Sequence, residues 1–217
     1  MLSTGPRRVD SLFLVQCSLA RRVTRQRLSS VIRHRLIAMG TLNAVYVRAS
    51  DPVTAAAVRA AYSVAYSESG TSFFAVDQPD DHFRCPDAEM EALSARLKTD
   101  VIWLSFQSAV DAFQYHHWND GKLVRSLVYG CFEKEREWER VEGTPQPWES
   151  GVFFGDLDRA LRYRDSEEER REIERIYRGK IIEVGAFEPA LEARESARGV
   201  AEFFRLPGWS LADGDGG

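Results

Sequence analysis

The chain has 217 residues, of which 44% are hydrophobic and 29% charged, a balance typical of a globular protein with one domain or two small ones. Its charge is uneven, because residues 1–38 hold eight arginines and one acidic residue, whereas the rest holds 32 acidic and 21 basic residues. The acidic body argues against nucleic-acid binding, since phosphate contacts need a basic face. Three cysteines fit a reducing compartment, and no apolar stretch reaches the roughly 18 residues of a membrane helix. We therefore expect a cytoplasmic protein that does not contact a membrane.

Residues 1–38 allow three interpretations. A short apolar run after two arginines resembles a signal peptide, but Gln16 interrupts it and more arginines follow at once. A basic arm is the second interpretation, and it would make nucleic acid or a membrane surface a partner only if these residues form a real arm. We favour the third, a disordered extension or a start assigned upstream of Met39. One folded domain is then expected at residues 39–209, followed by a disordered Gly/Asp-rich tail at 210–217.

Strands and helices are expected to alternate in the first half of the body. The expectation rests on apolar periodicity and on an Asp-Pro pair that is typical of a helix start. The predicted elements are strands at 42–48, 72–76 and 101–106, a helix that begins at Asp51 with a buried stripe from Val53 to Ala65, and a helix capped by Asp87.

The second half is expected to form a β-meander followed by helices. Two β-prone runs flank Asn119-Asp120-Gly121, a strong hairpin signal, and a charged run at 133–142 is typical of a protected edge strand. Helices are predicted from Asp156 to about Arg178 and from 189 to 204. The order predicts an α+β fold, with an antiparallel or mixed sheet and helices packed mainly on one face.

The loop of the hairpin decides which side chains share a face. A two-residue loop sets His116 opposite Arg125, whereas a three-residue loop with a bulged glycine sets Tyr115 opposite Arg125. In either register His116 and His117 point to opposite faces, so they cannot bind one metal ion as a pair.

In the second register Asp111, Tyr115, His117 and Arg125 lie on one apolar face. A buried arginine needs a carboxylate, which Asp111 or Glu149 could supply, and we favour an ion pair that fixes the register of the sheet. The alternative is a small pocket in which Arg125 holds an anion and His117 exchanges a proton.

Part of the chain resembles a domain family of bacterial proteins of unknown function. The resemblance covers residues 101–148, about a quarter of the chain, and its first element departs from the pattern by one residue at Ser108-Ala109-Val110-Asp111. The matching motifs are Trp118-Asn119-Asp120-Gly121, Leu123-Val124-Arg125-Ser126-Leu127 and, with one extra residue, Gly143-Thr144-Pro145-Gln146-Pro147-Trp148-Glu149. The resemblance implies a bacterial, cytoplasmic α+β domain and brings no assigned activity or site.

Motifs for catalysis or cofactor binding are missing from the sequence. It holds no serine-nucleophile elbow, no P-loop and no dinucleotide-binding glycine pattern. His82 and Cys85 have metal-like spacing, but no second pair follows, so we expect neither a metal nor a cofactor.

Three tryptophans near polar segments, Trp118, Trp138 and Trp148, are candidate contact residues, since tryptophan is enriched at interface hot spots. Alternatively they clamp the connector at 143–149 onto the sheet. We therefore predict a non-catalytic protein that acts through protein–protein contact. The alternative is a small enzyme or ligand-binding domain around Asp111, His117 and Arg125.

Overall fold

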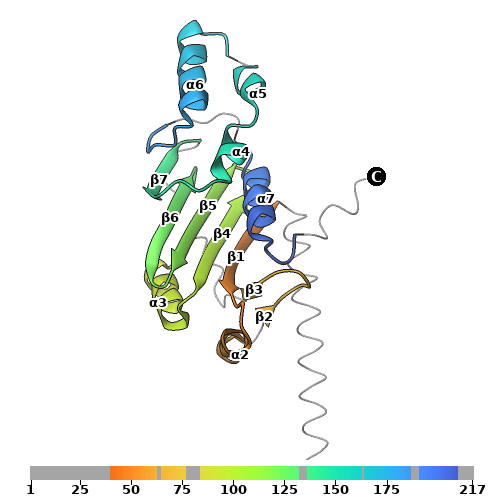
Figure 1. Cartoon of the computed structure of the whole chain (residues 1–217). Coiled ribbons are helices and arrows are strands. Elements are labelled where there is room, and N and C mark those ends of the chain that lie inside the picture. Colours follow the sequence, from red (N-terminus) through yellow and green to blue (C-terminus); the bar gives the residue numbers. More distant parts are fainter. Residues whose placement is uncertain are drawn as a thin grey trace, which may run out of the picture.

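A single antiparallel sheet of seven strands, in the order β2-β3-β1-β4-β5-β6-β7, forms the centre of the molecule (Figure 1). The computed structural model describes residues 40–62, 65–76, 84–131, 136–162, 164–186 and 191–209, so the expectations for residues 1–38, for His82 and for the tail at 210–217 lie outside it. The predicted α+β class with an antiparallel sheet is confirmed. The strands are β1 (Thr41–Arg48), β2 (Ala65–Tyr66), β3 (Phe73–Val76), β4 (Asp100–Gln107), β5 (Ala112–Asn119), β6 (Lys122–Tyr129) and β7 (Trp138–Gly143).

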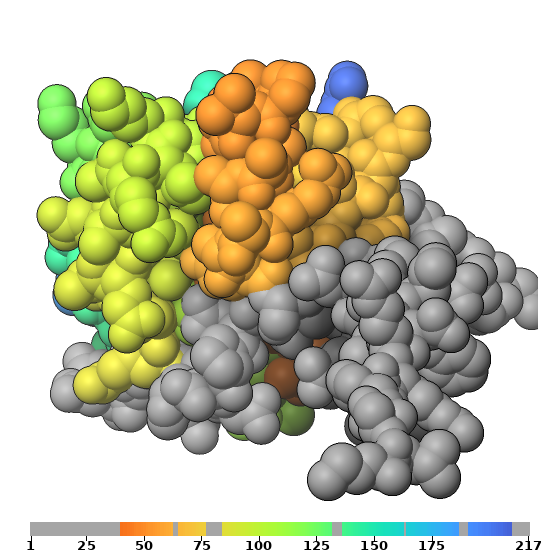
Figure 2. Space-filling model, turned by 90° about the horizontal axis from the view of Figure 1, so that it is seen from below, coloured from red at the N-terminus to blue at the C-terminus, as the bar shows by residue number. Residues whose placement is uncertain are grey.

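Helices cover both faces of the sheet, and the expectation that they pack mainly on one face is wrong. The helices are α2 (Pro52–Ala61), α3 (Asp87–Leu97), α4 (Glu149–Phe153), α5 (Leu157–Leu161), α6 (Glu167–Gly179) and α7 (Ala193–Phe204). The central strands carry mostly apolar side chains on both faces of the sheet, so each face has to be covered. Figure 2 views the molecule from below, where α2 (orange) lies between β2–β3 (amber) and α3 (yellow-green).

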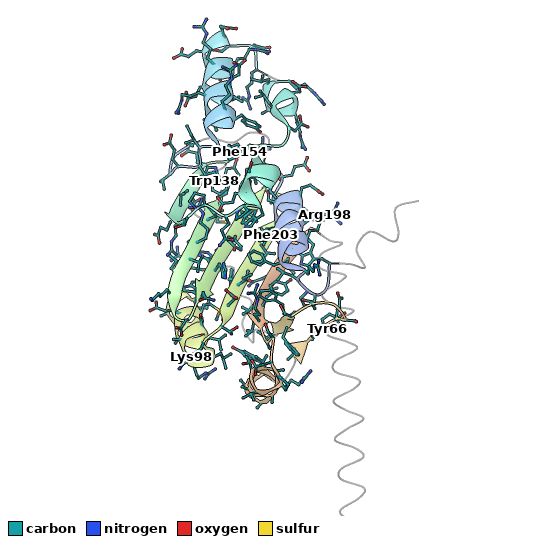
Figure 3. The ribbon with its side chains drawn as sticks, viewed as in Figure 1. Tyr66, Lys98, Trp138, Phe154, Arg198 and Phe203 are labelled. Carbon is teal, nitrogen blue, oxygen red and sulfur yellow. The ribbon has the colours of Figure 1, made fainter. Side chains whose placement is uncertain are left out.

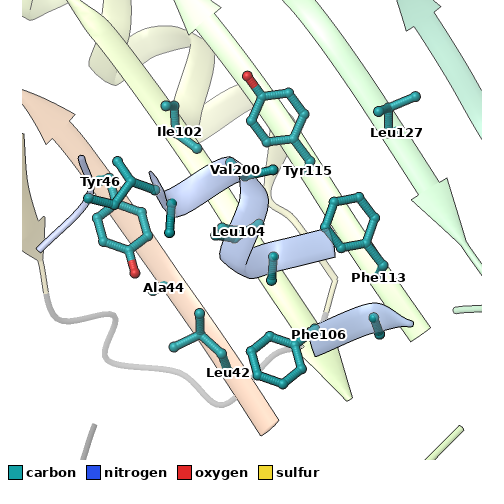
Figure 4. Packing of buried hydrophobic residues seen from close by; sticks show 14 of the residues in the cluster. Leu42, Ala44, Tyr46, Ile102, Leu104, Phe106, Phe113, Tyr115, Leu127 and Val200 are labelled. Carbon is teal, nitrogen blue, oxygen red and sulfur yellow. The ribbon is translucent and has the colours of Figure 1, made fainter. Parts of the chain in front are cut away.

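One face of the sheet packs against α7 and α4. Val200 of α7 lies over the central strands, with Leu104 of β4 and Tyr115 of β5 beneath it (Figure 4). The opposite face packs against α2 and α3, where Val58 and Leu93 are buried on the sheet. Residues that alternate along one strand therefore belong to two different cores.

Two of the predicted helices differ from those in the structure. The stripe expected on α2 is wrong, since Val53 is 79% exposed and Val58 is the buried residue of that helix. The helix expected from Asp156 to about Arg178 is two helices, because two side chains each cap a new start. Asp156 accepts a hydrogen bond from the backbone N–H of Arg159 in α5, and Ser166 accepts one from Glu169 in α6.

The α5–α6 pair extends beyond the end of the sheet, next to α4 and β7 (Figure 1). It has a small core of its own, and Phe154, labelled in Figure 3, packs against both this core and the core on the α7 face. Phe154 lies edge-on to Tyr177, with ring centroids 5.5 Å apart. The outer side of α6 is lined with charged side chains, many of them paired with each other along the helix.

The hairpin between β5 and β6 has a register that neither predicted loop gives. Asp120 and Gly121 form a two-residue turn with φ of 47° and 72°, which places Asn119 opposite Lys122. The register then shifts by one residue, so that His117, and not His116 or Tyr115, lies opposite Arg125. The extra residue, Val124, makes this shift a β-bulge.

The bulge at Val124 depends on a glycine in the neighbouring strand. Gly143 of β7 has a φ of 81°, and a Cβ atom added there would lie 2.1 Å from the carbonyl oxygen of Val124. A backbone atom cannot move aside as a side chain does, so both the backbone conformation and the space favour glycine at this position.

We expect Gly143→Ala to lower the free energy of unfolding by roughly 3 kcal/mol or more, through unfavourable φ together with a backbone clash. Gly70→Ala is the control, because Gly70 also has positive φ but faces open space, so its cost is about 1 kcal/mol. Urea unfolding of the two variants measures the difference, and equal losses would contradict the role given to the bulge.

Candidate functional site

Arg125 is buried on the α7 face and is paired with Glu149 of α4. Two parallel hydrogen bonds join them, from Nε to Oε1 at 2.9 Å and from Nη2 to Oε2 at 2.6 Å. The third guanidinium nitrogen donates to the backbone carbonyls of Glu142 and Gly143. Both side chains are less than 5% exposed, so the charge of the arginine is compensated entirely inside the protein. Of the two carboxylates considered for this role, Glu149 fills it.

Gln146, in the connector between β7 and α4, joins this pair to the rest of the face. Its backbone N–H donates to Glu149 Oε1 at 2.8 Å. Its side-chain oxygen accepts hydrogen bonds from the hydroxyl of Tyr115 and from the indole N–H of Trp148, both at 2.8 Å. Its side-chain nitrogen lies 3.0 Å from Nδ1 of His117.

These contacts assign the tautomer of His117. An indole N–H can only donate, so the oxygen of Gln146 faces Trp148 and the amide nitrogen faces the histidine. His117 Nδ1 therefore accepts, and Nε2 carries the proton that is donated to Asp100 Oδ1 at 2.8 Å.

Asp100, at the start of β4, ends this chain of contacts. The same oxygen, Oδ1, accepts from Asn119 at 2.8 Å, and Oδ2 lies 2.7 Å from the guanidinium of Arg48. Burial alone raises the pKa of this carboxyl, but the hydrogen bonds from His117 and Asn119, together with Arg48, outweigh it and hold the pKa below its usual value of 3.8.

Three of the four residues predicted to form a ligand site meet on this face, and the fourth does not. Tyr115, His117 and Arg125 are neighbours, and Phe204 of α7 packs over Tyr115 and His117 with ring centroids 6.3 and 5.5 Å away. Asp111 lies in the turn before β5, where it pairs with Arg136 at 3.3 Å near the surface.

A ligand pocket at Tyr115, His117 and Arg125 is contradicted by this geometry. Their polar groups bond to protein partners, and Phe204 packs over Tyr115 and His117, so none is left to hold an anion or to exchange a proton with a substrate. The favoured interpretation, a buried ion pair that stabilises one arrangement of the sheet, agrees with the structure. Asp100 and Gln146 were missed by sequence reasoning, because nothing local distinguishes them from other polar residues at strand ends and in connectors.

The three tryptophans are core residues, and the prediction that they form interface contacts is wrong. Trp118, Trp138 and Trp148 are 2%, 3% and 5% exposed. Trp148 packs edge-on against Tyr115 at 5.0 Å, so it holds the connector against the sheet, as the alternative interpretation expected. Trp138 packs against Phe153, whereas Trp118 lies in the core under α3.

The opposite face holds a second group of chemically capable side chains. Cys85 and Asp87 lie at the start of α3, and His116 reaches them from β5, which confirms that His116 and His117 point to opposite faces. One donor atom from each of the three lies within 4.8 Å of the others. They line a groove of about 620 Å³ that also contains Gln114 and Arg140.

Burial controls the protonation of this second group. It lowers the pKa of His116 to about 4, so the imidazole is neutral near pH 7, and it raises the pKa of the Cys85 thiol well above its usual value. Asp87 was expected to cap α3 with its side chain, but it is the first residue of the helix and makes no capping hydrogen bond. Its carboxylate instead accepts a hydrogen bond from Arg140 at 2.7 Å.

Comparisons with models of protein families, with curated proteins and with solved structures found no match to this chain. The resemblance of residues 101–148 to a bacterial domain family therefore stays a prediction. None of the helices within the ranges that the structure describes is long and apolar enough to cross a membrane.

We expect Glu149→Gln to destabilise the fold by about 3 kcal/mol, because it leaves the Arg125 guanidinium buried without an opposite charge. Glu174→Gln breaks the exposed pair with Arg178 and should cost less than about 1 kcal/mol. Denaturant unfolding at pH 7 measures both, and a cost for Glu149→Gln as small as that of the control would contradict the buried pair.

Asp100→Asn should cost roughly 2 kcal/mol at pH 7, because it removes the ionised acceptor of His117, Asn119 and Arg48. The folded state lowers the pKa of Asp100, so the carboxylate stabilises the fold above the unfolded value of 3.8 and loses this effect as the pH falls through the folded value. The difference in unfolding free energy between wild type and variant should therefore narrow below about pH 4. A difference that stays constant down to pH 3 would show that the ionised form is not the stabilising one.

Proposed function

We propose that this chain is a non-catalytic bacterial protein that acts in the cytoplasm by binding a basic segment of another protein. The observation that carries the proposal is a groove of about 1200 Å³ between α6 and the segment that follows it. The residues that line it are Arg164, Glu167, Glu168, Glu169, Arg171, Glu172, Ile173, Arg175, Ile176, Glu183, Val184, Gly185 and Ala186.

The groove combines apolar and charged surface. Ile173 and Ile176 line the groove but are buried, 7% and 8% exposed, whereas Val184 is 63% exposed and supplies accessible apolar surface. Helix α6, which forms one wall of the groove, stands clear of the sheet, so an extended partner has access to it (Figures 1 and 3).

The charges of the groove favour a basic partner. Five glutamates line it against three arginines. Arg171 pairs with Glu167, and Arg175 pairs with Glu172 and Glu183, so these pairs engage two of the arginines and three of the glutamates. The groove keeps a net charge of 3 − 5 = −2. Negative potential at a groove steers basic partners toward it, and charge complementarity adds specificity more than affinity.

The structure does not support the alternative that the chain is a small enzyme. It depended on an open pocket at Asp111, His117 and Arg125, and these residues either lie apart or bond to protein groups beneath α7. The binding function, by contrast, needs only an accessible surface of suitable shape and charge, which the α6 groove provides.

Affinity capture with the purified full chain, followed by binding measurements on each captured protein, tests the proposal. A basic partner should bind wild type. Its affinity should fall about tenfold or more for Val184→Asp, because the apolar contact between the valine and the partner is lost. Val53→Asp is the control, since Val53 is also an exposed valine but lies on α2 and does not line the groove, so this variant should leave binding unchanged.

The affinity should also weaken as salt concentration rises, because exposed charges are screened. Capture of no partner by wild type would overturn the proposal. So would partners whose affinity is the same for wild type and Val184→Asp.

A further inference from the structure

The group at the start of α3 is brought together by a tight turn and a neighbouring strand. The backbone N–H of Asp87 donates to the carbonyl of Cys85 at 3.1 Å, which keeps these two residues close on either side of Pro86. His116 projects toward them from β5, and its Nδ1 lies 3.8 Å from Asp87 Oδ1. The three residues thus place a sulfur, a carboxylate oxygen and an imidazole nitrogen within 4.8 Å of one another.

His116 itself indicates that this cluster takes a ligand. The side chain is 2% exposed, and Nδ1 lies 2.9 Å from the hydroxyl of Ser126. The other nitrogen, Nε2, is buried and has no hydrogen-bond partner among the described residues, and the same holds for Asp87 Oδ1. A buried polar atom without a partner is costly, so two of them at one cluster call for an explanation.

We propose that Cys85, Asp87 and His116 form a binding site for a divalent transition-metal ion, with zinc the best fit. A thiolate, an imidazole and a carboxylate are the ligand types that zinc takes in proteins, whereas magnesium and calcium prefer oxygen ligands alone. Tetrahedral zinc sets its ligand atoms roughly 3.3–3.8 Å apart, so two ligand atoms at the 4.8 Å limit have to approach by about 1.0–1.5 Å. Three protein ligands leave the fourth position to water or to a bound molecule.

Neighbouring residues make the hydrogen bonds that orient the side chains of metal ligands. The nitrogen of His116 nearest to Asp87 is Nδ1, which also contacts the Ser126 hydroxyl. The ion is bound by Nδ1 if this hydroxyl releases it, or by Nε2 if Nδ1 donates to Ser126. Arg140 donates to Asp87 Oδ2 at 2.7 Å and so orients the carboxylate, while Glu142, 3.0 Å from the same guanidinium, offsets its charge. Four carboxylates and two guanidinium groups line the groove, which gives a cation a route from solvent.

Cobalt and zinc titrations of the full chain, after removal of bound metal with a chelator, test the site. We expect one equivalent of Co²⁺ per chain, with the near-ultraviolet charge-transfer absorption of a cobalt–thiolate bond, and its displacement by Zn²⁺. Zn²⁺ should also raise the thermal midpoint, since it binds the folded state.

Cys85→Ser and His116→Gln should weaken Co²⁺ binding on the order of a hundredfold or more, and Cys85→Ser should abolish the charge-transfer band. Cys131→Ser and Cys17→Ser are the controls that should keep both. Cys131 is a half-buried thiol held by the carbonyls of Phe113 and Tyr129, apart from the cluster. Glu168→Gln changes a residue that lines the α6 groove but not the groove at Cys85, so this variant should bind metal normally, which separates the two sites.

The proposal is overturned if wild type takes up no stoichiometric Co²⁺ or Zn²⁺ at micromolar concentrations. It is also overturned if the thiolate band survives in Cys85→Ser or disappears in Cys17→Ser or Cys131→Ser, because the ligand would then be another cysteine. Circular dichroism identifies any variant that fails to fold. If Cys85→Ser is such a variant, His116→Gln decides, and unchanged metal affinity in that variant rejects the site.

Discussion

A buried arginine on an apolar sheet face has to find a carboxylate, and that requirement organises one half of this molecule. Arg125 meets Glu149 only because the connector after β7 turns back over the sheet. The bulge at Val124 sets the register that places the guanidinium there, and Gly143 leaves room for the bulge. Because an unpaired guanidinium would be far more costly than any alternative packing of the connector, the pair selects one register and one path of the chain.

The two faces of the sheet follow different rules, although their residues alternate along the same strands. On the α7 face the buried groups of Arg125, His117 and Gln146 are matched with one another, which gives rigidity and leaves nothing for a ligand. On the α3 face His116 keeps an unmatched nitrogen beside a groove. The candidate ligand-binding residues therefore lie on the face opposite to the one that the sequence favoured. Because neighbouring residues of β5 point to opposite faces, His117 joins the hydrogen-bonded network on one face and His116 joins the candidate site on the other.

Several features of the fold could be predicted because their causes are local. The hairpin turn follows from the backbone freedom of Asp120 and Gly121, and the opposite orientation of His116 and His117 follows from the two-residue period of a strand. Glu149 was one of the two carboxylates, with Asp111, that the sequence offered as partners of Arg125. The register could not be predicted, since a bulge depends on the strand that lies next to it. The same holds for the tryptophans, whose proximity to polar segments says nothing about the surface that folds over them.

The sequence by itself determined the α+β class, the order of its central elements and the need of Arg125 for a carboxylate, because periodicity, turn chemistry and the cost of a buried charge act over short distances or on single residues. Tertiary structure decided which polar residues meet. Cys85 and Asp87 are two residues apart in the sequence, but only the fold adds His116 to them, from a strand that follows later in the chain. Contacts between distant segments depend on how strands pair and helices cover them, and neither spacing nor composition encodes that arrangement.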